Sequence, residues 1–560
     1  MSEEEGKRSE QRGVIITSAL PYANGEIHLG HVLSTYLPAD IFARFNRLKG
    51  LDVVFTCATD DFGTPILLRA EKEGKRPEEY VEYWHQRDLR DFNETGIVFD
   101  LFHKTSSKEN IELVQHFFTL LHDKGLIYEN GITQMYCEYD KKFLPDRYVV
   151  GTCPYCGAIN QYSDGCENCG RAFTHTEILE PRCAICGRPP IMKSSLHYFF
   201  KLSAFSQRLR DWLNNNENLQ SEIRNYVGRW IDDGLKDWDI TRDINWGVSI
   251  PLEEAKGKVL YGWFDNHLCY ISSTLLYLKN RGIDGKAFWN SSQIYHFIGK
   301  DIVYHHFLFL PAMRMAAEEY KVPEFIPARG HLMLKGEKFS KSKGWYIGLR
   351  EFLEVFPADY LRYYFSRITS YDQSDVNFDW DDFAAKINNE LVASIGNFIH
   401  RTLSFINSRF KGKVPELGEL TGEDLAFIEK IKNIPIQVGE LLQRNEMDRG
   451  MGAILEFSGA CNQYFQHKSP WANTKESFTT LNISANAVRT LSILLMPYLP
   501  LSMTNLRGQF NLSTPSLSWE NAGLLEIPVG HEIQAPTILF RKVEKSEIVK
   551  RKSLLGKAGK

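Results

Sequence analysis

The sequence lacks any apolar run long enough to cross a membrane, and it carries no strong excess of charge of one sign. No stretch of about 18 consecutive apolar residues occurs in the chain, so no transmembrane helix is expected. The first residues, MSEEEGKRSEQR, are charged and contain no apolar core of a secretory signal, which predicts a cytoplasmic location. The formal net charge is −4, so a nucleic-acid partner would have to be held by local basic patches.

Isolated cysteines are also few, because seven of the ten cysteines lie between residues 137 and 186. Six of these form three Cys-x-x-Cys pairs, which in a reducing compartment indicate metal knuckles rather than disulfides. Two pairs fall in the segment CPYCGAINQYSDGCENCG, where four thiolates at that spacing predict a closed tetrahedral zinc site. The predicted ligands are Cys153, Cys156, Cys166 and Cys169.

The third Cys-x-x-Cys pair has no obvious partner pair, but the upstream segment YCEYD offers a cysteine and an aspartate at knuckle spacing. We expect a second, weaker zinc site with the ligands Cys137, Asp140, Cys183 and Cys186. Unliganded thiols of a decayed site are the alternative. Both sites are predicted to be structural, because a catalytic zinc keeps an open coordination position. A zinc-ribbon nucleic-acid binder would be the simplest non-enzyme explanation, but it leaves most of the chain unexplained.

The N-terminal part alternates between strand and helix patterns. The β-branched segments at 14–19 and 52–60 predict buried strands, and an apolar stripe at a spacing of four residues predicts a helix from about residue 27, kinked at Pro38. This alternation predicts an α/β fold with a doubly wound parallel sheet. Ligands of such sheets bind beyond the carboxyl ends of the strands, where the turn SALPYANG and Asp60 would lie.

Two motifs outside the cysteine-rich segment could contact an anion. PYANGEIHLGHVL carries His28 and His31 on either side of Leu29 and Gly30; the pair could be half of a metal site, two surface residues or hydrogen-bond donors. EKFSKSKG, residues 337–344, carries three lysines in a Gly/Ser loop after a strand, which suits a phosphate-binding segment.

Together these motifs resemble the paired HIGH and KMSKS signatures of class I aminoacyl-tRNA synthetases. The resemblance is closest to the methionyl-tRNA synthetase family of the archaeal-like type and runs from about residue 14 to 530. It is carried by the segments ALPYANGEIHLGH, TDDFGTPI, FLPDRYVVGTCPYCG, HYFF, RDINWGVSIP, YHFIGKDIVY and LRYYF.

The resemblance implies a catalytic mechanism and a set of site residues. Amino-acid activation would use ATP with Mg²⁺, while zinc has a structural role. Catalysis is assigned by resemblance to His28, His31, Lys338 and Lys341. The ATP site would add Tyr22, Gly30, Gly299 and Asp301. The amino-acid site would contain Leu20, Tyr22, Asp60, Trp263, Tyr270 and His306, with Asp60 pairing with the substrate ammonium.

The resemblance also suggests a division of the chain, with a Rossmann-type catalytic domain interrupted by a zinc-binding insertion. We expect an N-terminal tail at 1–12, the first half of the catalytic domain at 13–125, the insertion at 126–255, the second half at 256–335, the KFSKS loop and stem-contact region at 336–382, an anticodon-binding helical bundle at 383–530 and a basic tail at 531–560.

The predicted amino-acid pocket departs from the family pattern. The family usually reads WFDAPIGY where this chain reads WFDNHLCY, so Asn266, His267 and Cys269 are substitutions, and His305 stands where an aromatic residue is common. Buried polar groups cost about 1–3 kcal/mol each without partners. Either these residues pair with one another in a repacked wall, or the pocket takes a more polar amino acid.

The tRNA side of the resemblance favours methionine. Asn397 and Arg401 lie one helical turn apart, and Trp471 follows a proline; by resemblance these three residues recognise the CAU anticodon. An ordinary bundle surface is the alternative. The expected partners are tRNA(Met) and L-methionine, with no membrane, and a monomer is expected. The rival hypotheses are a paralogue that activates another amino acid and a tRNA-binding protein with a decayed site.

Overall fold

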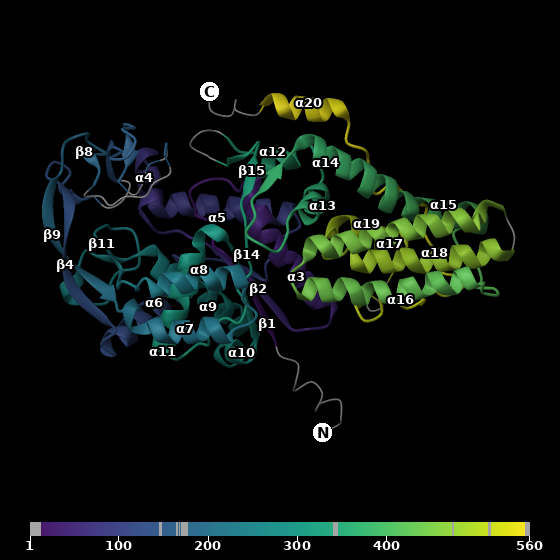
Figure 1. Ribbon diagram of the computed structural model, residues 1–560, viewed down its shortest axis with the longest axis horizontal. Coiled ribbons are helices and arrows are strands. Elements are labelled where there is room, and N and C mark those ends of the chain that lie inside the picture. The colour runs from purple at the N-terminus through teal and green to yellow at the C-terminus, as the bar shows by residue number, and fades with distance from the viewer. Residues whose placement is uncertain are drawn as a thin grey trace, which may run out of the picture.

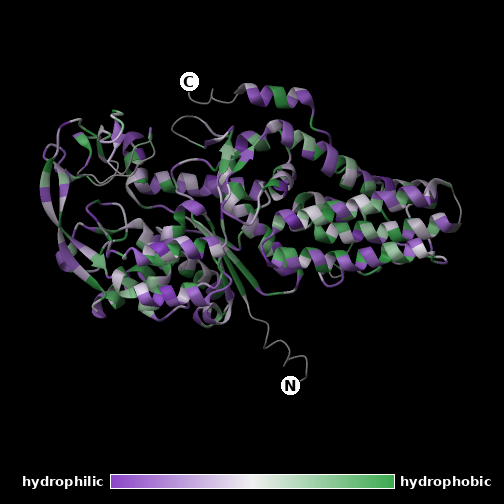
Figure 2. Ribbon diagram, viewed as in Figure 1, coloured by the Kyte–Doolittle hydropathy of each residue, from purple (hydrophilic) through white to green (hydrophobic). Residues whose placement is uncertain are grey.

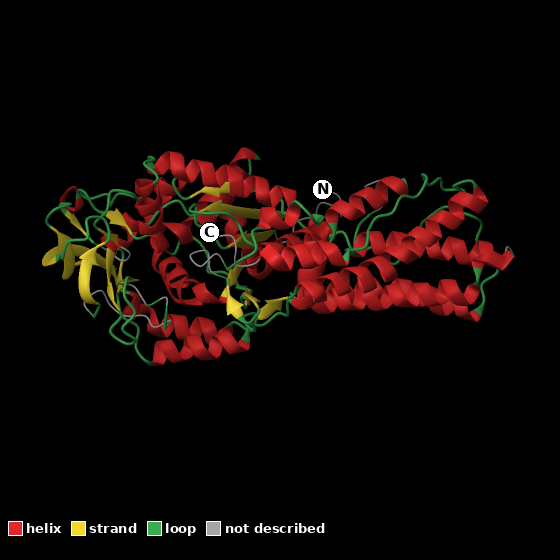
Figure 3. Ribbon diagram, turned by 90° about the horizontal axis from the view of Figure 1, so that it is seen from above, coloured by secondary structure: helices red, strands yellow, loops and turns green. Residues whose placement is uncertain are grey.

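The computed structural model describes residues 13–144, 148–163, 166, 168–169, 177–339, 345–472, 475–512 and 517–554. The predicted tail at 1–12 lies outside these residues. Figure 1 shows an elongated molecule with a central α/β part, a β-rich part at one end and a helical bundle at the other. Figure 3 shows the described strands gathered in the first two parts and the bundle built of helices. Among the described residues, no helix is both long and apolar enough to span a bilayer.

A parallel five-stranded sheet in the order β14-β13-β1-β2-β3 forms the centre of the molecule. Val14 of β1 is in register with Gln293 of β13 on one side and Val53 of β2 on the other. All five residues of β1 are buried, as expected for a strand covered on both faces. The predicted doubly wound sheet is therefore confirmed. Its strands are β1 (Val14–Ser18), β2 (Val53–Thr59), β3 (Leu101–Lys104), β13 (Gln293–Gly299) and β14 (Ala328–Arg329).

Helices connect these strands. The helix predicted from about residue 27 consists of three segments: a short α2, a π-helical turn η1 and α3, which begins just before Pro38. Pro38 has no N–H to continue the hydrogen-bond ladder, which accounts for the interruption near it. The segments around the sheet are α2 (Leu29–His31), η1 (Val32–Tyr36), α3 (Leu37–Leu48), α4 (Thr64–Lys72), α5 (Pro77–Glu94), α6 (Lys108–Asp123), α9 (Gly262–Asn280), α10 (Gly285–Ser291), η6 (His305–Phe309) and α11 (Leu310–Ala317).

The cysteine-rich part, where we expected a zinc-binding insertion at 126–255, has regular strands and helices. It contains a sheet in the order β10-β9-β4-β5 and a second sheet in the order β7-β6-β8. Two amphipathic helices follow, whose residues Leu209 and Ile223 are buried in one cluster with Ile294 of the central sheet. The elements are β4 (Ile127–Cys137), β5 (Lys142–Phe143), β6 (Val149–Thr152), β7 (Gln161–Tyr162), β8 (Leu179–Cys183), β9 (Ile191–Phe200), α7 (Ser206–Asn215), α8 (Ser221–Asp232) and β10 (Trp238–Asp239).

A small sheet, in the order β16-β15-β17, leads from the central part into the bundle. The hydropathy colouring shows bundle helices with both hydrophilic and hydrophobic positions along their length (Figure 2). The elements are β15 (Leu332–Leu334), β16 (Glu337–Lys338), α12 (Leu349–Leu353), α13 (Ala358–Ile368), β17 (Val376–Phe378), α14 (Trp380–Lys386), η7 (Ile387–Gly396), α15 (Asn397–Phe410), α16 (Gly422–Gln443), α17 (Met447–Lys468), α18 (Lys475–Leu494), α19 (Pro500–Gln509) and α20 (Lys545–Leu554).

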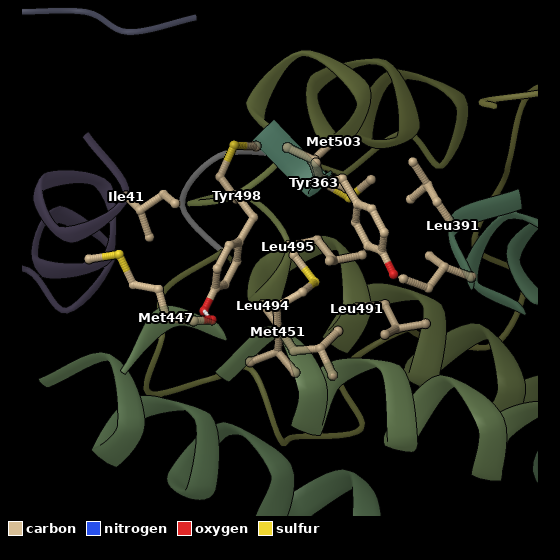
Figure 4. Close-up of a cluster of buried hydrophobic side chains, with 14 of the residues drawn as sticks. Ile41, Tyr363, Leu391, Met447, Met451, Leu491, Leu494, Leu495, Tyr498 and Met503 are labelled. Atoms are coloured by element: carbon tan, nitrogen blue, oxygen red, sulfur yellow. Dashed lines mark hydrogen bonds between the residues drawn. The ribbon is translucent and has the colours of Figure 1, made fainter. Parts of the chain in front are cut away.

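The bundle is joined to the central part by a buried apolar core. Ile41 of α3 lies in this cluster with Met447 of α17 and Tyr498, whose hydroxyl donates to the Met447 carbonyl at 3.0 Å (Figure 4). Beside it, Arg362 of α13 donates to the Asp40 carboxylate of α3 at 2.7 Å, and both side chains are fully buried. Removing one partner of such a buried ion pair typically costs about 3–5 kcal/mol, because the other charge is left buried and unpaired, so this contact links the bundle to the sheet.

Candidate active site

A cavity of about 600 Å³ lies at the carboxyl ends of the central strands. Its wall includes Ala19 just after β1, Asp60 just after β2 and Gly299 at the end of β13. The cavity collects most of the predicted ATP and amino-acid residues, namely Leu20, Tyr22, His28, Gly30, His31, Asp60, Trp263, Tyr270, Gly299, Asp301 and Lys338. Of the other two, His306 is buried behind Tyr270, and Lys341 lies outside the described residues.

His28 and His31 form a stacked pair on the wall of this cavity. Their ring centroids are 3.6 Å apart with planes 11° from parallel, and the His28 backbone N–H donates to His31 Nδ1 at 3.2 Å. A Cβ at Gly30 would lie 3.1 Å from the His28 ring, so a side chain there would crowd the pair. Because Nδ1 of His31 accepts, a neutral His31 carries its proton on Nε2, which makes that nitrogen a donor.

The second motif meets the first in the same cavity. Lys338 at the end of β16 lines it, and the next side chain, Phe339, stacks on His28 with ring centroids 5.4 Å apart. Beyond residues 340–344, which are not described, the chain returns to the histidines: Gly348 forms a β-bridge with His28. The Leu29 N–H donates to the Ile347 carbonyl at 3.2 Å. Two segments far apart in sequence are thus brought to one site.

Strand β13 contributes another part of the cavity wall, at Gly299. A Cβ at Gly299 would lie only 2.7 Å from the Asp301 carboxylate, so the glycine lets the aspartate fold back over the strand end. His331 also lines the cavity, and burial lowers the pKa of its imidazole. Sequence analysis missed His331; its place just after β14, at the carboxyl edge of the sheet, was the available signal.

A buried carboxyl group lies at the inner end of the cavity. Asp60 is tied to the turn after β1, because its N–H donates to the Pro21 carbonyl at 2.8 Å and its carbonyl accepts from the Ala23 N–H at 2.9 Å. Burial raises the pKa of Asp60 to about 7, opposed by a hydrogen bond from Asn266 and reinforced by the neighbouring Asp61. Burial disfavours the ionised form of the Asp60 carboxyl, and a cation bound in the cavity would favour it.

The aromatic wall beside Asp60 is internally hydrogen-bonded. Burial lowers the pKa of His306 to about 3, so its ring is neutral. Its Nδ1 lies 3.1 Å from the Ile302 carbonyl, which can only accept, so Nδ1 carries the proton. Its Nε2 then accepts from the Tyr270 hydroxyl at 2.9 Å. The His306 Nδ1 proton and the Tyr270 hydroxyl proton are therefore both donated to partners within the protein.

Of the two alternatives for the substituted residues, hydrogen bonding with one another is not what the described residues show. Asn266 instead donates its Nδ2–H to Asp60 Oδ2 at 2.9 Å, across 206 positions of sequence. His267 is buried against Trp263 and His306, with ring centroids 5.5 and 5.1 Å away, and neither ring nitrogen has a hydrogen-bond partner among the described residues. His305 stacks on Trp263 at 3.9 Å. Sequence analysis noted Asn266 but missed its contact with Asp60.

Two groups of potential metal ligands lie in the cysteine-rich part. In each group one ligand atom per residue lies within 4.8 Å of the others; the first is Cys153, Cys156, Cys166 and Cys169, and the second is Cys137, Asp140, Cys183 and Cys186. In the first, Sγ–Sγ distances of 3.6 and 3.9 Å match the edge of about 3.8 Å expected for four thiolates 2.3 Å from zinc.

The second group has the same local geometry with a carboxylate in place of one thiolate. The Asp140 N–H donates to Cys137 Sγ at 3.4 Å, as the Tyr155 N–H does to Cys153 Sγ at 3.4 Å. Asp140 Oδ2 lies 3.1 Å from the sulfurs of both Cys137 and Cys183. The chemistry of both donor sets therefore fits zinc.

Two of the three predicted anticodon residues lie on α15 against α17, and the third follows the end of α17. Asn397 is exposed on α15, with its Nδ2 3.5 Å from Asn462 Oδ1 of α17. One turn later, Arg401 lies over the Phe465 ring of α17, 4.9 Å from its centroid. Trp471, 38% exposed, follows directly after α17. These three residues offer amide, guanidinium and indole groups to a partner.

Comparison with known proteins agrees with this geometry. Residues 14–403 match the family model described as "tRNA synthetases class I (M)", and residues 414–556 match "Anticodon binding domain of methionyl tRNA ligase". A methionine–tRNA ligase of Methanosphaera stadtmanae is 42% identical over 96% of this chain and 81% of its own length. One from Methanobrevibacter smithii is 44% identical over 97% of this chain and 82% of its own length.

The fold also matches a solved structure. Mycobacterium tuberculosis methionyl-tRNA synthetase bound by methionyl-adenylate superimposes with a TM-score of 0.79 at 23% identity, covering 95% of this chain and all of the other. The predicted combination of a parallel-sheet domain and a C-terminal helical part is thus found in both. From the family models and the curated relatives, the chain belongs to the methionyl-tRNA synthetases, the methionine–tRNA ligases among the class I aminoacyl-tRNA synthetases.

Proposed function

We propose that the cavity is where L-methionine and ATP form methionyl-adenylate, and that the methionyl group then passes to the 3′-terminal adenosine of tRNA(Met). The observation that carries this proposal is the convergence of His28, His31 and Lys338 on one cavity that also contains the buried Asp60. Donors of positive character at one end and a carboxyl group at the other suit a triphosphate and an amino acid with a free ammonium group.

The chemistry follows from where charge moves. The methionine carboxylate attacks the α-phosphate of ATP, and the bond to pyrophosphate breaks, so negative charge grows on the leaving oxygens. His28, His31, Lys338 and Lys341 are proposed to donate to those oxygens, which stabilises the transition state more than bound ATP. When bound with ATP, Mg²⁺ would neutralise further phosphate charge.

The remaining cavity residues are proposed to position the two substrates. Gly299 and Asp301 would hold the ribose, with Gly30 leaving room beside the adenine and Tyr22 lying between the two substrate sites. Asp60 would pair with the methionine ammonium. The apolar side chain would lie against Leu20, Trp263 and Tyr270, and His306 would act from behind Tyr270 by holding its hydroxyl.

ATP–pyrophosphate exchange tests the phosphate-binding roles. His31→Ala and Lys341→Ala are each expected to lower the exchange rate about 10²- to 10³-fold, the usual effect of removing one transition-state donor. Lys335→Ala is a matched control, because this lysine lies in the neighbouring turn between β15 and β16 and does not line the cavity. Near wild-type exchange in both test variants would refute the assignment.

The same assay separates the rival hypotheses. Exchange with methionine alone across a panel of amino acids supports the methionine assignment. Exchange with a different amino acid would indicate a paralogue of altered specificity, as the substitutions at Asn266 and His267 first suggested. Absence of exchange would indicate a tRNA-binding protein with a decayed site.

We further propose that both cysteine-rich groups bind structural zinc, giving two ions per chain. Each set supplies four ligands, so neither leaves an open position for catalysis. Metal analysis of the purified protein is expected to find two zinc ions, and one in Cys183→Ala. Cys461→Ser should keep both, because Cys461 is buried in the bundle away from either group. One zinc in the unchanged protein would rule out the second site.

The remaining assignments rest on the family and the sequence. We propose that the insertion at 126–255 helps place the acceptor end of the tRNA and that the bundle at 383–530 reads the CAU anticodon through Asn397, Arg401 and Trp471. Action as a monomer in the cytoplasm stays a prediction from the sequence.

A further inference from the structure

Asn266 and Asp60 together present two unused acceptor atoms at the cavity. The Asn266 amide donates through Nδ2 to Asp60 Oδ2 at 2.9 Å. The remaining oxygens, Asn266 Oδ1 and Asp60 Oδ1, are buried and have no hydrogen-bond partner among the described residues. Both residues line the cavity, and the two oxygens are buried within its wall.

Hydrogen-bond chemistry identifies which atom of the Asn266 amide faces Asp60. When Asp60 is ionised, its carboxylate only accepts hydrogen bonds, so the Asn266 amide then turns its nitrogen toward Asp60 and leaves its own oxygen without a partner. The result is a pair of adjacent acceptors, one charged and one neutral. A ligand that satisfies both must bring at least two N–H or O–H donors, and a positive charge is favoured by the carboxylate.

We propose that Asn266 is a substrate-binding residue that holds the amino-acid ammonium jointly with Asp60, through its own Oδ1, while its Nδ2–H fixes the orientation of the Asp60 carboxylate. This inference rests on the proposed pairing of Asp60 with the ammonium and extends it. A primary ammonium has three N–H donors, enough for both oxygens with one left over. The substitution that first looked like a change of side-chain specificity therefore acts on the amino group.

The surroundings support a ligand rather than an internal partner. The next residue, His267, directs neither ring nitrogen to a partner among the described residues and makes no hydrogen bond with Asn266. The charged or titratable groups facing Asp60 are Asp61, Asp265 and Tyr270, which at neutral pH bring no positive charge. The described residues that face Asp60 supply no cation, so the substrate would have to bring the positive charge that completes this site.

The test compares methionine with 4-(methylthio)butanoate, which keeps the carboxylate and thioether but lacks the ammonium. In Asn266→Ala the dissociation constant and the KM for methionine are expected to rise about 10- to 100-fold, the usual effect of losing a hydrogen bond to a charged group. The kcat of exchange and the KM for ATP should change less than about threefold, and the affinity for the deaminated analogue should not change.

Two further variants separate the possible failures. Cys269→Ala removes a buried side chain one turn along α9 that does not line the cavity, so it controls for general damage to the helix. Asn266→Ser supplies a second replacement if Asn266→Ala does not fold. Equal weakening of methionine and of its deaminated analogue, or an unchanged methionine KM, would overturn the inference.

Asp60→Asn distinguishes this inference from the proposed function. If Asp60→Asn weakens methionine binding but Asn266→Ala does not, only the role of Asn266 fails. If Asp60→Asn also leaves methionine binding unchanged, the ammonium assignment of Asp60 itself is wrong.

Discussion

Burial makes the charge of Asp60 costly, and this cost has a consequence for pH dependence. Its pKa is raised to about 7 by burial, and that of the adjacent Asp61 to about 6 for the same reason. Burial also raises the pKa of Asp265, whose two carboxylate oxygens have no partner among the described residues. With a pKa of about 7, Asp60 is close to half-protonation at neutral pH, and the proposed pairing with an ammonium requires its ionised form.

We therefore expect kcat/KM for methionine to fall by up to tenfold per pH unit below about pH 7, because kcat/KM reports the ionisation of the free enzyme. The KM for ATP should follow this limb much less. A pH-independent kcat/KM for methionine from pH 5.5 to 8 would contradict the assignment.

The free energy of unfolding depends on pH in the opposite direction. The folded state binds the Asp60 proton more tightly than the unfolded state, so the stabilisation from this group is full below about pH 4 and is lost as the pH rises through about 7.

Sequence analysis found residues whose chemistry is carried by a local motif and missed those defined by long-range contacts. His28, His31 and Lys338 stand in short recognisable segments, and all three line the cavity. The Asn266–Asp60 hydrogen bond joins residues 206 positions apart, and neither local segment indicates it. Burial and pairing depend on which distant strand or helix covers a residue, and the local sequence pattern around a residue does not reveal this.

At the scale of elements, residues 345–349, which follow KFSKS, contact the segment that carries His28 and His31. Tyr346 donates its hydroxyl to Glu26 Oε1 at 2.7 Å, and Glu26 also pairs with Arg87 of α5 at 2.9 Å. The Leu349 N–H donates to the Ile27 carbonyl at 3.0 Å. These contacts place the start of α12 against the strand-like residues that precede the histidines.

Tyr346→Phe removes one of these links and leaves the ring. We expect the KM for ATP to rise about three- to fivefold, because a net hydrogen bond is worth about 1 kcal/mol, with the KM for methionine nearly unchanged. Trp345→Phe is the matched control, since the Trp345 indole donates to the Leu334 carbonyl and not to the histidine side of the segment. An equal effect of both substitutions would show that the segment acts only through packing.

Elements were predictable where their pattern is strong. Strands β1 and β2 are short β-branched runs at the centre of the sheet, and both were found from sequence. Helices α7 and α8 were missed, although Leu209 and Leu213, then Ile223 and Val227, repeat at spacings of four. Their apolar stripes are narrow and lie next to the cysteine-rich loops, whose glycines and cysteines dominated the interpretation of that region.

At the scale of the whole molecule, the cavity and the proposed anticodon residues belong to different parts that share a buried interface. The Asp40–Arg362 pair and the apolar core around Tyr498 connect α3 of the sheet domain with the bundle. The proposed anticodon residues do not line the cavity, so we expect tRNA recognition there to leave the chemistry of activation unaltered. Activation and tRNA recognition should be separable by mutation.

Trp471→Ala tests this separation. Its indole is 38% exposed beyond the end of α17, and loss of a base-stacking side chain costs about 1–3 kcal/mol, so kcat/KM for tRNA(Met) in aminoacylation should fall roughly 5- to 150-fold. Exchange with methionine should be unchanged, because Trp471 does not line the cavity. Ile436→Ala is the control. Ile436 is exposed on α16 and does not line the cavity, so this variant should leave both reactions unchanged. If Trp471→Ala lowered exchange and aminoacylation together, the bundle would act on the active site itself rather than as a separate recognition surface.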